Sequence, residues 1–377
     1  MKTNGFSSSL SSCTRQTFRG YGTGFAFLSS FLSAADANGT ARASVVSSVA
    51  MVFMGGGVGG TCQLWTPASA EKVTAPARPE RSFRAAPAWA TVPPMKRAAA
   101  DWAELLPDED YGFHFGLKPG DAAAFFAPSP DHEALVAQRR HWFAVDAPRY
   151  AVLLPGAEPM VRETIALARR WQSLTPEGDA AIRDAGATGD GWAELLALGV
   201  AWEMDFALLS VAGGEPKLVA GCVCFPSQWR LTDKVGHGIS VIHGPVPGLN
   251  AALAPRIAGF LAKLKPGPAF LRANWGLSRS AELNQHPEQN IPRLAPPLRA
   301  DEVFLRIENQ ALVALPASGG VLFGIRLEVH PLAEVRRDPV AARGLSRGLR
   351  TMPGDMAAYK NIAHVRAEVL ALLKGHE

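Results

Sequence analysis

One stretch of the sequence, residues 217–249, constrains the fold more than any other. Its first part, Leu218–Phe225, is dense in Val, Leu, Cys and Phe, and this composition predicts a buried or half-buried β-strand. Pro226 cannot donate a backbone hydrogen bond, so the strand ends there or lies at a sheet edge. A polar loop follows, and the stretch closes on the run IHGPVPG, in which two glycines and two prolines surround His243.

The backbone around His243 has little conformational freedom. A histidine in such a frame loses little orientational entropy on binding, which suits a metal or haem ligand. The same frame is compatible with a partly buried histidine that is satisfied inside a rigid turn. Local sequence alone leaves both interpretations open and favours the second.

Elsewhere the chain mixes helical and strand patterns. Apolar residues recur at helical spacing in residues 134–143, 160–174, 190–198, 251–264, 339–349 and 361–373. Strand patterns occupy residues 202–211, 270–275, 303–308 and 320–329, and the run Thr175-Pro176-Glu177 is expected to close the second helix. Because regular βαβ alternation is absent, we expect an α+β fold in which helices wrap an antiparallel sheet.

Composition excludes several classes of protein. The chain has 377 residues, 47% hydrophobic and 19% charged, which is ordinary for a globular protein and excludes wholesale disorder. The net charge of +4 is small, and no dense Lys/Arg run with interleaved aromatics occurs, so nucleic acid is not an implied partner. Cys222 and Cys224 lack the spacing of zinc or iron–sulfur ligands, so we expect them to be small buried hydrophobes in a reducing compartment.

Residues 1–81 differ from the rest of the chain. Ser, Gly, Ala and Thr dominate, and no charged residue lies between Arg42 and Glu71. We expect the segment to be disordered or removable, either as a targeting peptide or because the start codon is assigned too far upstream, with the native start near Met51, Met54 or Met95. No apolar run reaches the about 18 residues that a spanning helix needs, so we expect no membrane span.

Residues 82–112 begin with a Pro- and Ala-rich run and predict a linker or extended arm. The folded domain is expected to cover residues 113–377. The cysteine usage favours a cytoplasmic location, with an organellar one as the alternative if residues 1–81 are a transit peptide. The oligomeric state does not follow from the sequence.

Several motifs occur in a fixed order along this domain. The string FPSQWRLTDKVGHGISVIHGPVPG precedes RANW at 272–275, RIENQAL at 306–312, LP at 315–316 and YK at 359–360. Upstream lie FGLKP at 115–119 and EMD at 203–205. Over residues 113–374 these motifs resemble the haem-dependent oxidative N-demethylase family, formerly a domain of unknown function with a PAS-like core. Asn309 departs from the arginine that is frequent in the family at that place.

The resemblance implies a PAS-like sheet that binds haem b and its iron. It implies a haem-dependent monooxygenase that uses O2 to oxidise the N-methyl group of a small secondary amine, with loss of formaldehyde. The chain has no iron–sulfur spacing, and residues 113–377 contain no GxGxxG loop, so a separate flavin or iron–sulfur reductase must supply the electrons. Two alternatives remain, a non-catalytic haem-binding sensor or carrier and a haem-free structural subunit.

The resemblance further identifies His243, rather than His237, as the axial iron ligand. Haem propionates need cationic or hydrogen-bonding partners, and the candidates within the matching motifs are Lys234, Arg230, Arg272 and Arg306. Each of these could equally be a solvated charge at the end of a strand. Trp275 could pack on the haem or, more simply, in the core.

Polar residues at every second position predict where a pocket wall lies. Arg306, Glu308 and Gln310 alternate along an apolar strand and therefore share one face. Three such groups need a ligand or mutual pairing, so we expect them to form one wall of the haem or substrate pocket. Glu203 and Asp205 could likewise meet the ammonium group of an amine or move protons. The alternative for these two residues is a surface pair of carboxylates.

Overall fold

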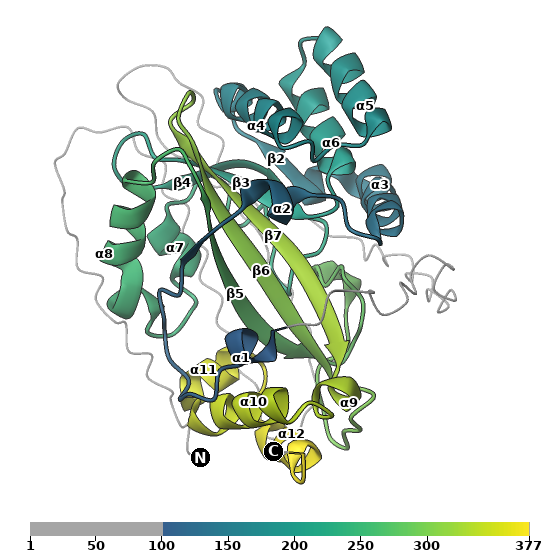
Figure 1. Cartoon of the computed structure of the whole chain (residues 1–377), viewed down its shortest axis with the longest axis vertical. Coiled ribbons are helices and arrows are strands. Elements are labelled where there is room, and N and C mark those ends of the chain that lie inside the picture. Colours follow the sequence, from purple (N-terminus) through teal and green to yellow (C-terminus); the bar gives the residue numbers. More distant parts are fainter. Residues whose placement is uncertain (1–100, 377) are drawn as a thin grey trace, which may run out of the picture. The chain divides into compact units, whose positions relative to one another are not determined.

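The computed structural model describes residues 101–376. The expectations for residues 1–100 lie outside this range. Seven strands form one sheet in the order β1-β5-β6-β7-β3-β4-β2, and every neighbouring pair is antiparallel (Figure 1). The strands are β1 (Lys118–Gly120), β2 (Ala151–Leu153), β3 (Asp205–Ser210), β4 (Lys217–Cys222), β5 (Ala269–Ser278), β6 (Phe304–Leu315) and β7 (Gly320–Pro331).

Strands β3 to β7 form the centre of the fold. They lie in the spatial order β4-β3-β7-β6-β5, so the first strand of the set pairs with both the second and the last. Helices α7 (Ile239–His243) and α8 (Leu249–Ala262) occupy the connection between β4 and β5. This is the PAS arrangement, and it confirms the expected α+β class with a PAS-like antiparallel sheet.

The register of the strands defines two faces of the sheet, because residues directly opposite one another point the same way. Arg272 on β5 lies opposite Gln310 on β6, and Asn274 lies opposite Glu308. Gln310 in turn lies opposite Ile325 of β7. We call the face that carries Arg272, Glu308 and Gln310 the site face, and the other the back face.

Helices that precede β3 in the chain and helices that follow β7 cover the back face. The preceding helices α2 (Ala122–Phe126), α4 (Glu158–Arg170) and α6 (Gly191–Ala201) pack against Phe206, Leu208 and Leu322. The helices that follow β7, α10 (Pro339–Thr351) and α12 (Arg366–Leu373), pack against Leu305 and Ile307 (Figure 1). The odd positions of β6 other than Asn309 are therefore core residues, as the alternation in its sequence predicts.

Two groups of elements cover the site face. Ile242 of α7 and Ile257, Phe260 and Leu261 of α8 join the apolar cluster that contains Phe270, Leu312 and Phe323 of the sheet. Helix α3 (His132–Tyr150) contributes Leu135 and Tyr150 to a second cluster with Leu327 and Val329 of β7. The polar side chains of β5 and β6 lie between these two apolar regions along the strands.

Helix α5 (Pro176–Ala187) contradicts one expectation, since Thr175-Pro176-Glu177 was expected to close a helix and instead begins one. The hydroxyl of Thr175 accepts a hydrogen bond from the backbone N–H of Gly178 at 3.1 Å. Pro176 occupies the first helical position, where no backbone donor is needed. The remaining helices are α1 (Trp102–Leu105), α9 (Leu332–Val335), α11 (Gly354–Tyr359) and the short 3-10 helix Pro287–Gln289.

Strand β4 ends three residues earlier than its composition predicts. The N–H of Val223 donates to the carbonyl of Tyr150 at 2.7 Å. The N–H groups of Cys224 and Phe225 donate to the carboxylate of Asp205 at 2.7 and 2.9 Å. Because these three donors are already engaged, the segment leaves the ladder before Pro226.

Within residues 101–376, no helix combines the length and the apolar character that crossing a membrane requires.

Candidate functional site

His243 is the last residue of α7, a short helix that lies over the site face (Figure 1). Ile242 packs into the apolar cluster of α8, whereas Val241 is 57% exposed. His243, next along the helix, is half-buried. Only Ile242 and His243 of the segment expected to be rigid are helical, and residues 244–248 form turns. Gly244 keeps helical dihedral angles, and Gly248 adopts the left-handed conformation, at φ 72°.

The imidazole of His243 lies beside two positive charges. Burial lowers its pKa, and the charges of Arg272 and Lys234 lower it further. The ring is therefore neutral at pH 7, which is the form that binds metals. Lys234 also donates from Nζ to the backbone carbonyl of Ile242 at 3.2 Å, so it contacts the helix that carries His243.

Arg272 projects from β5 onto the site face. Its side chain is half-buried, and its buried Nε atom has no hydrogen-bond partner among residues 101–376. Burial lowers the pKa of Arg272, and the negative charge of Glu308 opposes this effect. This desolvated guanidinium therefore has a donor free to bind an acceptor from outside the described chain.

Glu308 and Gln310 are neighbours on the site face of β6. The amide of Gln310 donates to Oε2 of Glu308 at 3.2 Å, and the hydroxyl of Ser227 donates to Oε1 at 2.8 Å. Both donors are neutral, so they orient the carboxylate without neutralising its charge. The carboxylate is half-buried and influences the charges of Arg272 and Lys360.

Lys360 and Tyr111 complete the group, and neither was singled out as a site residue from sequence. Lys360 donates from Nζ to the carbonyl of Trp275 at 2.6 Å and lies 5.5 Å from the centre of its indole ring. Burial lowers the pKa of Lys360 to about 8. Burial also raises the pKa of Tyr111 to about 12, with a smaller effect from Tyr359. The YK motif was the available signal for Lys360, whereas Tyr111 lies outside every motif.

Three predicted cofactor residues have other surroundings. Arg306 is buried and donates to the carbonyls of Glu282 and Leu283 at 2.8 and 3.1 Å. Arg230 lies 3.8 Å from Asp233. Trp275 points to the back face and packs on Tyr111 with ring centres 6.3 Å apart. Their roles in cofactor binding stay predictions.

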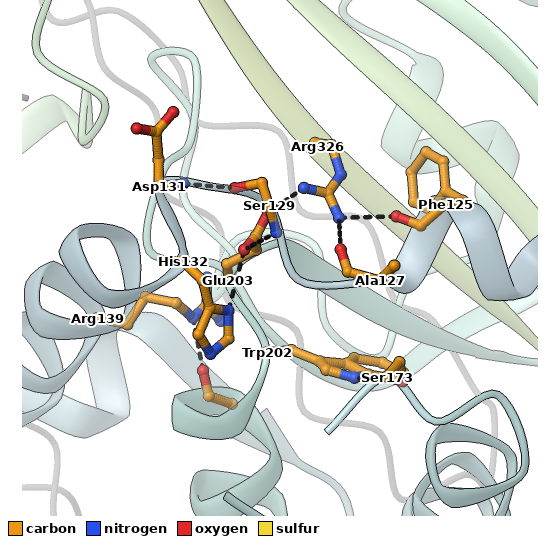
Figure 2. A network of polar contacts seen from close by, with 11 residues as sticks. Phe125, Ala127, Ser129, Asp131, His132, Arg139, Ser173, Trp202, Glu203 and Arg326 are labelled. Atoms are coloured by element: carbon orange, nitrogen blue, oxygen red, sulfur yellow. Dashed lines mark hydrogen bonds and ion pairs between the residues drawn. The ribbon is translucent and has the colours of Figure 1, made fainter. Parts of the chain in front are cut away.

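Glu203 lies in a buried polar network that joins α3 to the sheet (Figure 2). Its carboxylate accepts hydrogen bonds from Nδ1 of His132 and the N–H of Ser129, at 3.0 and 2.9 Å, and forms an ion pair with Arg326. Burial by itself raises the pKa of Glu203, but these partners lower it to about 2. The partners come from the α2–α3 connection, α3 and β7.

Asp205 lies in a separate network. It accepts a hydrogen bond from Nη1 of Arg139 at 2.6 Å in addition to those from the backbone of residues 224 and 225. Both side chains are buried. The alternative of a surface carboxylate pair is therefore wrong for Glu203 and Asp205. All observed contacts of these two carboxylates are to other groups of the protein, and their catalytic roles stay predictions.

The thiols of Cys222 and Cys224 are buried, as expected. Burial raises the pKa of both, which keeps them protonated near neutral pH. Within residues 101–376, no three His, Cys, Asp or Glu side chains are placed to hold a metal ion. A single neutral histidine beside buried cations instead suits an iron that a macrocycle already holds.

A family model described as haem-dependent oxidative N-demethylase, alpha subunit-like, matches residues 182–370. The matched range contains all five strands from β3 to β7 and helices α7 and α8. It also contains His243, Arg272, Glu308 and Lys360. It begins after α3, so His132 and Arg139 lie outside it.

Proposed function

Because the chain belongs to the haem-dependent oxidative N-demethylase, alpha subunit-like family, we propose that it binds haem b through His243 and oxidatively demethylates a small secondary amine. The observation that carries this proposal is the pairing of a neutral, half-buried His243 with the desolvated guanidinium of Arg272 on one face of the sheet.

The residues present fit a haem group. His243 supplies one neutral nitrogen ligand for iron. The unused Nε donor of Arg272 suits a propionate, since charge-assisted hydrogen bonds to carboxylates are the strong ones. Lys360 adds positive charge near Arg272, and Lys234 adds positive charge near His243. The family name supports haem dependence, and these donors supply the contacts that it requires.

Glu308 suits the positive charge of an amine substrate. Secondary amines are protonated at neutral pH, and a half-buried carboxylate attracts such a cation more strongly than a solvated one does. Ser227 and Gln310, both neutral, hold its two oxygens, and its charge also interacts with those of Arg272, Arg306 and Lys360. Gln310 lies next to Arg272 in the register, so the carboxylate and the expected propionate partner share one surface.

Haem supplies the oxidative chemistry, and the reaction balances as one N-methyl amine, O2, two electrons and two protons giving the demethylated amine, formaldehyde and water. The residues of this chain bind and orient the amine and hold the charges of the cofactor. A separate reductase supplies the electrons, and the described chain supplies the pocket.

The test is formaldehyde formation by the haem-loaded full-length chain. We expect formaldehyde and O2 uptake in equal amounts when a small N-methyl amine and a reductase or chemical electron donor are added. Glu308→Gln should raise KM for the amine about tenfold or more, because it removes a charged contact of about 1.5–3 kcal/mol.

The matched control is Glu328→Gln, a half-buried carboxylate of β7 that faces the back side of the sheet. Its KM should equal that of the wild type. A protein that binds haem but forms no formaldehyde with any small N-methyl amine would contradict the proposal and support the sensor or carrier function instead.

A further inference from the structure

The start of α7 is joined to the start of β4. Residues 217 and 238 form an isolated antiparallel bridge. The N–H of Leu218 donates to the carbonyl of His237 at 3.2 Å, and the N–H of Gly236 donates back to Leu218 at 2.7 Å. One residue further along, the N–H of Ile239 donates to the carbonyl of Pro216 at 2.9 Å. The β3–β4 connection therefore fixes the entry to the helix that carries His243.

Glu215 in that connection caps α7 from outside the helix. Its Oε1 accepts a hydrogen bond from the N–H of Ser240, the second residue of α7, at 2.8 Å. The residue at the usual capping position is Gly238, which has no side chain that could accept this hydrogen bond. A Cβ atom on Gly238 would overlap the Glu215 carboxylate. The glycine therefore makes room for a cap supplied by another segment of the chain.

The rest of α7 is also held from outside. Asn250 donates from Nδ2 to the carbonyl of Ser240 at 2.8 Å. Lys234 donates to the carbonyl of Ile242, as described above. A helix of five residues has almost no stability of its own, because nucleating one turn is unfavourable. The direction of the His243 side chain thus depends on these three side chains.

We propose that Glu215 is a positioning residue that fixes α7 so that the imidazole of His243 meets the haem iron in one orientation. This inference rests on the proposed role of His243 as the haem ligand. Partners that orient a metal ligand from behind typically contribute 10–100-fold to metal affinity. Glu215 would act through the backbone of the ligand helix instead of through the imidazole itself.

Glu215 can be changed without disturbing the core. It follows Ala212, Gly213 and Gly214, all of which are exposed, and its side chain is absent from the apolar clusters. Removing its carboxylate leaves no buried cavity and no buried ion without a partner. A change in haem binding would therefore report on α7 and not on general unfolding.

The experiment compares Glu215→Ala and Glu215→Gln in the full-length chain. Haem affinity is measured by titration, and the orientation of the ligand by the electron paramagnetic resonance spectrum of ferric haem. We expect Glu215→Ala to bind haem about tenfold more weakly and to give a broadened or shifted spectrum. Glu215→Gln keeps a carbonyl oxygen for the N–H of Ser240 and should restore most of both properties.

Asp190→Ala is the matched control. Asp190 caps α6 through the N–H of Trp192 at 2.9 Å, a contact of the same kind that lies on another helix. The haem affinity and the spectrum of the Asp190→Ala variant should equal those of the wild type. Unchanged affinity and spectrum in Glu215→Ala would overturn the proposal.

Amide hydrogen exchange of the haem-free protein separates this inference from the proposed function. Glu215→Ala should speed exchange in residues 239–243 whether or not haem binds there. Fast exchange together with haem binding that does not need His243 would refute the ligand assignment, and with it the positioning of a ligand, while confirming the cap. Exchange equal to that of the wild type would refute the cap itself.

Discussion

Arginines with a buried donor fall into two kinds within residues 101–376. Arg139 and Arg306 each keep one buried donor without a partner, but their other donors bind a carboxylate or backbone carbonyls, so most of their burial is compensated inside the protein. Arg272 has a buried donor without an acceptor, and its guanidinium donates no hydrogen bond to any residue of the described chain. A buried cation of this second kind costs stability unless a ligand meets it.

We therefore predict opposite effects for two substitutions. Arg272→Met should leave the free energy of unfolding of the haem-free protein within about 1 kcal/mol of wild type and weaken haem binding about tenfold or more. Arg306→Met should instead destabilise the haem-free protein by about 2–4 kcal/mol, because two buried carbonyls lose their donor. Denaturant unfolding of both haem-free variants measures the change in stability, and haem titration of both variants measures the change in haem affinity.

The opposite pattern, a stable Arg306→Met protein that loses haem, would support the role of Arg306 in haem binding that the sequence predicts. That prediction followed from the period of two, which correctly put Arg306 beside Glu308 and Gln310. The period of two could not reveal that the loop at residues 279–290 folds back, so that two of its carbonyls accept hydrogen bonds from the guanidinium of Arg306.

Glu203 gives a prediction about pH. Its pKa of about 2 lies below the ordinary glutamate value of about 4.3, so its ion pairs stabilise the protein above that value and lose their effect as pH falls toward 2. Glu203→Gln should therefore reduce the free energy of unfolding by about 3 kcal/mol at pH 7 and by about half as much at pH 3. Glu177→Gln, at an exposed position, is the control.

Urea unfolding at the two pH values measures the difference. A Glu203→Gln effect that is equal at pH 3 and pH 7 would show that the carboxylate charge does not carry the stabilisation.

At the level of elements, apolar periodicity predicted the helices that pack against the sheet. Both α4 and α10 begin and end within a few residues of the expected ranges. Short elements were missed, since α7 has five residues and is held by side chains from other segments. Such an element has no periodicity to detect, so the sequence could predict His243 as a candidate ligand but not the helix that carries it.

The edge of β5 shows how a terminal element can contribute to a site. Strand β1 pairs only with residues 269–271, and Lys360, at the end of α11, donates to the carbonyl of Trp275 further along the same strand. The pKa of Lys360 is about 8 in the folded protein because of burial, against an unfolded value of about 10.4. Between these values the unfolded chain binds more protons, so the contribution of Lys360 to stability rises with pH.

This sign gives a third prediction. The wild type should gain about 2 kcal/mol in free energy of unfolding relative to Lys360→Met between pH 7.5 and pH 10. The exposed Lys217→Met serves as control and should show no such gain. Guanidinium unfolding at both pH values measures this gain in the free energy of unfolding. A wild type that loses stability relative to Lys360→Met over this range would contradict the lowered pKa of Lys360.

At the scale of the whole described chain, the sheet presents two faces with different tasks. The back face carries the polar residues Asn309, Arg326, Glu328 and His330, but it is otherwise apolar and covered by helices from both ends of the described chain, which supplies most of the core. The site face is apolar at α7 and α8 and at α3, and polar between them. The α+β class could be predicted because regular βαβ alternation is absent, and the polar strand from the period of two in residues 306–310. The contacts from residues 111, 227 and 360 required the folded chain.

The central claim is that His243 binds the haem iron, and its most direct test is the haem content of the full-length chain. After reconstitution with haem b, the ratio of Soret absorbance to protein should indicate about one haem per chain for the wild type and for His237→Ala, because His237 is exposed. His243→Ala should retain almost no haem. Equal haem content in His243→Ala and the wild type would contradict the account.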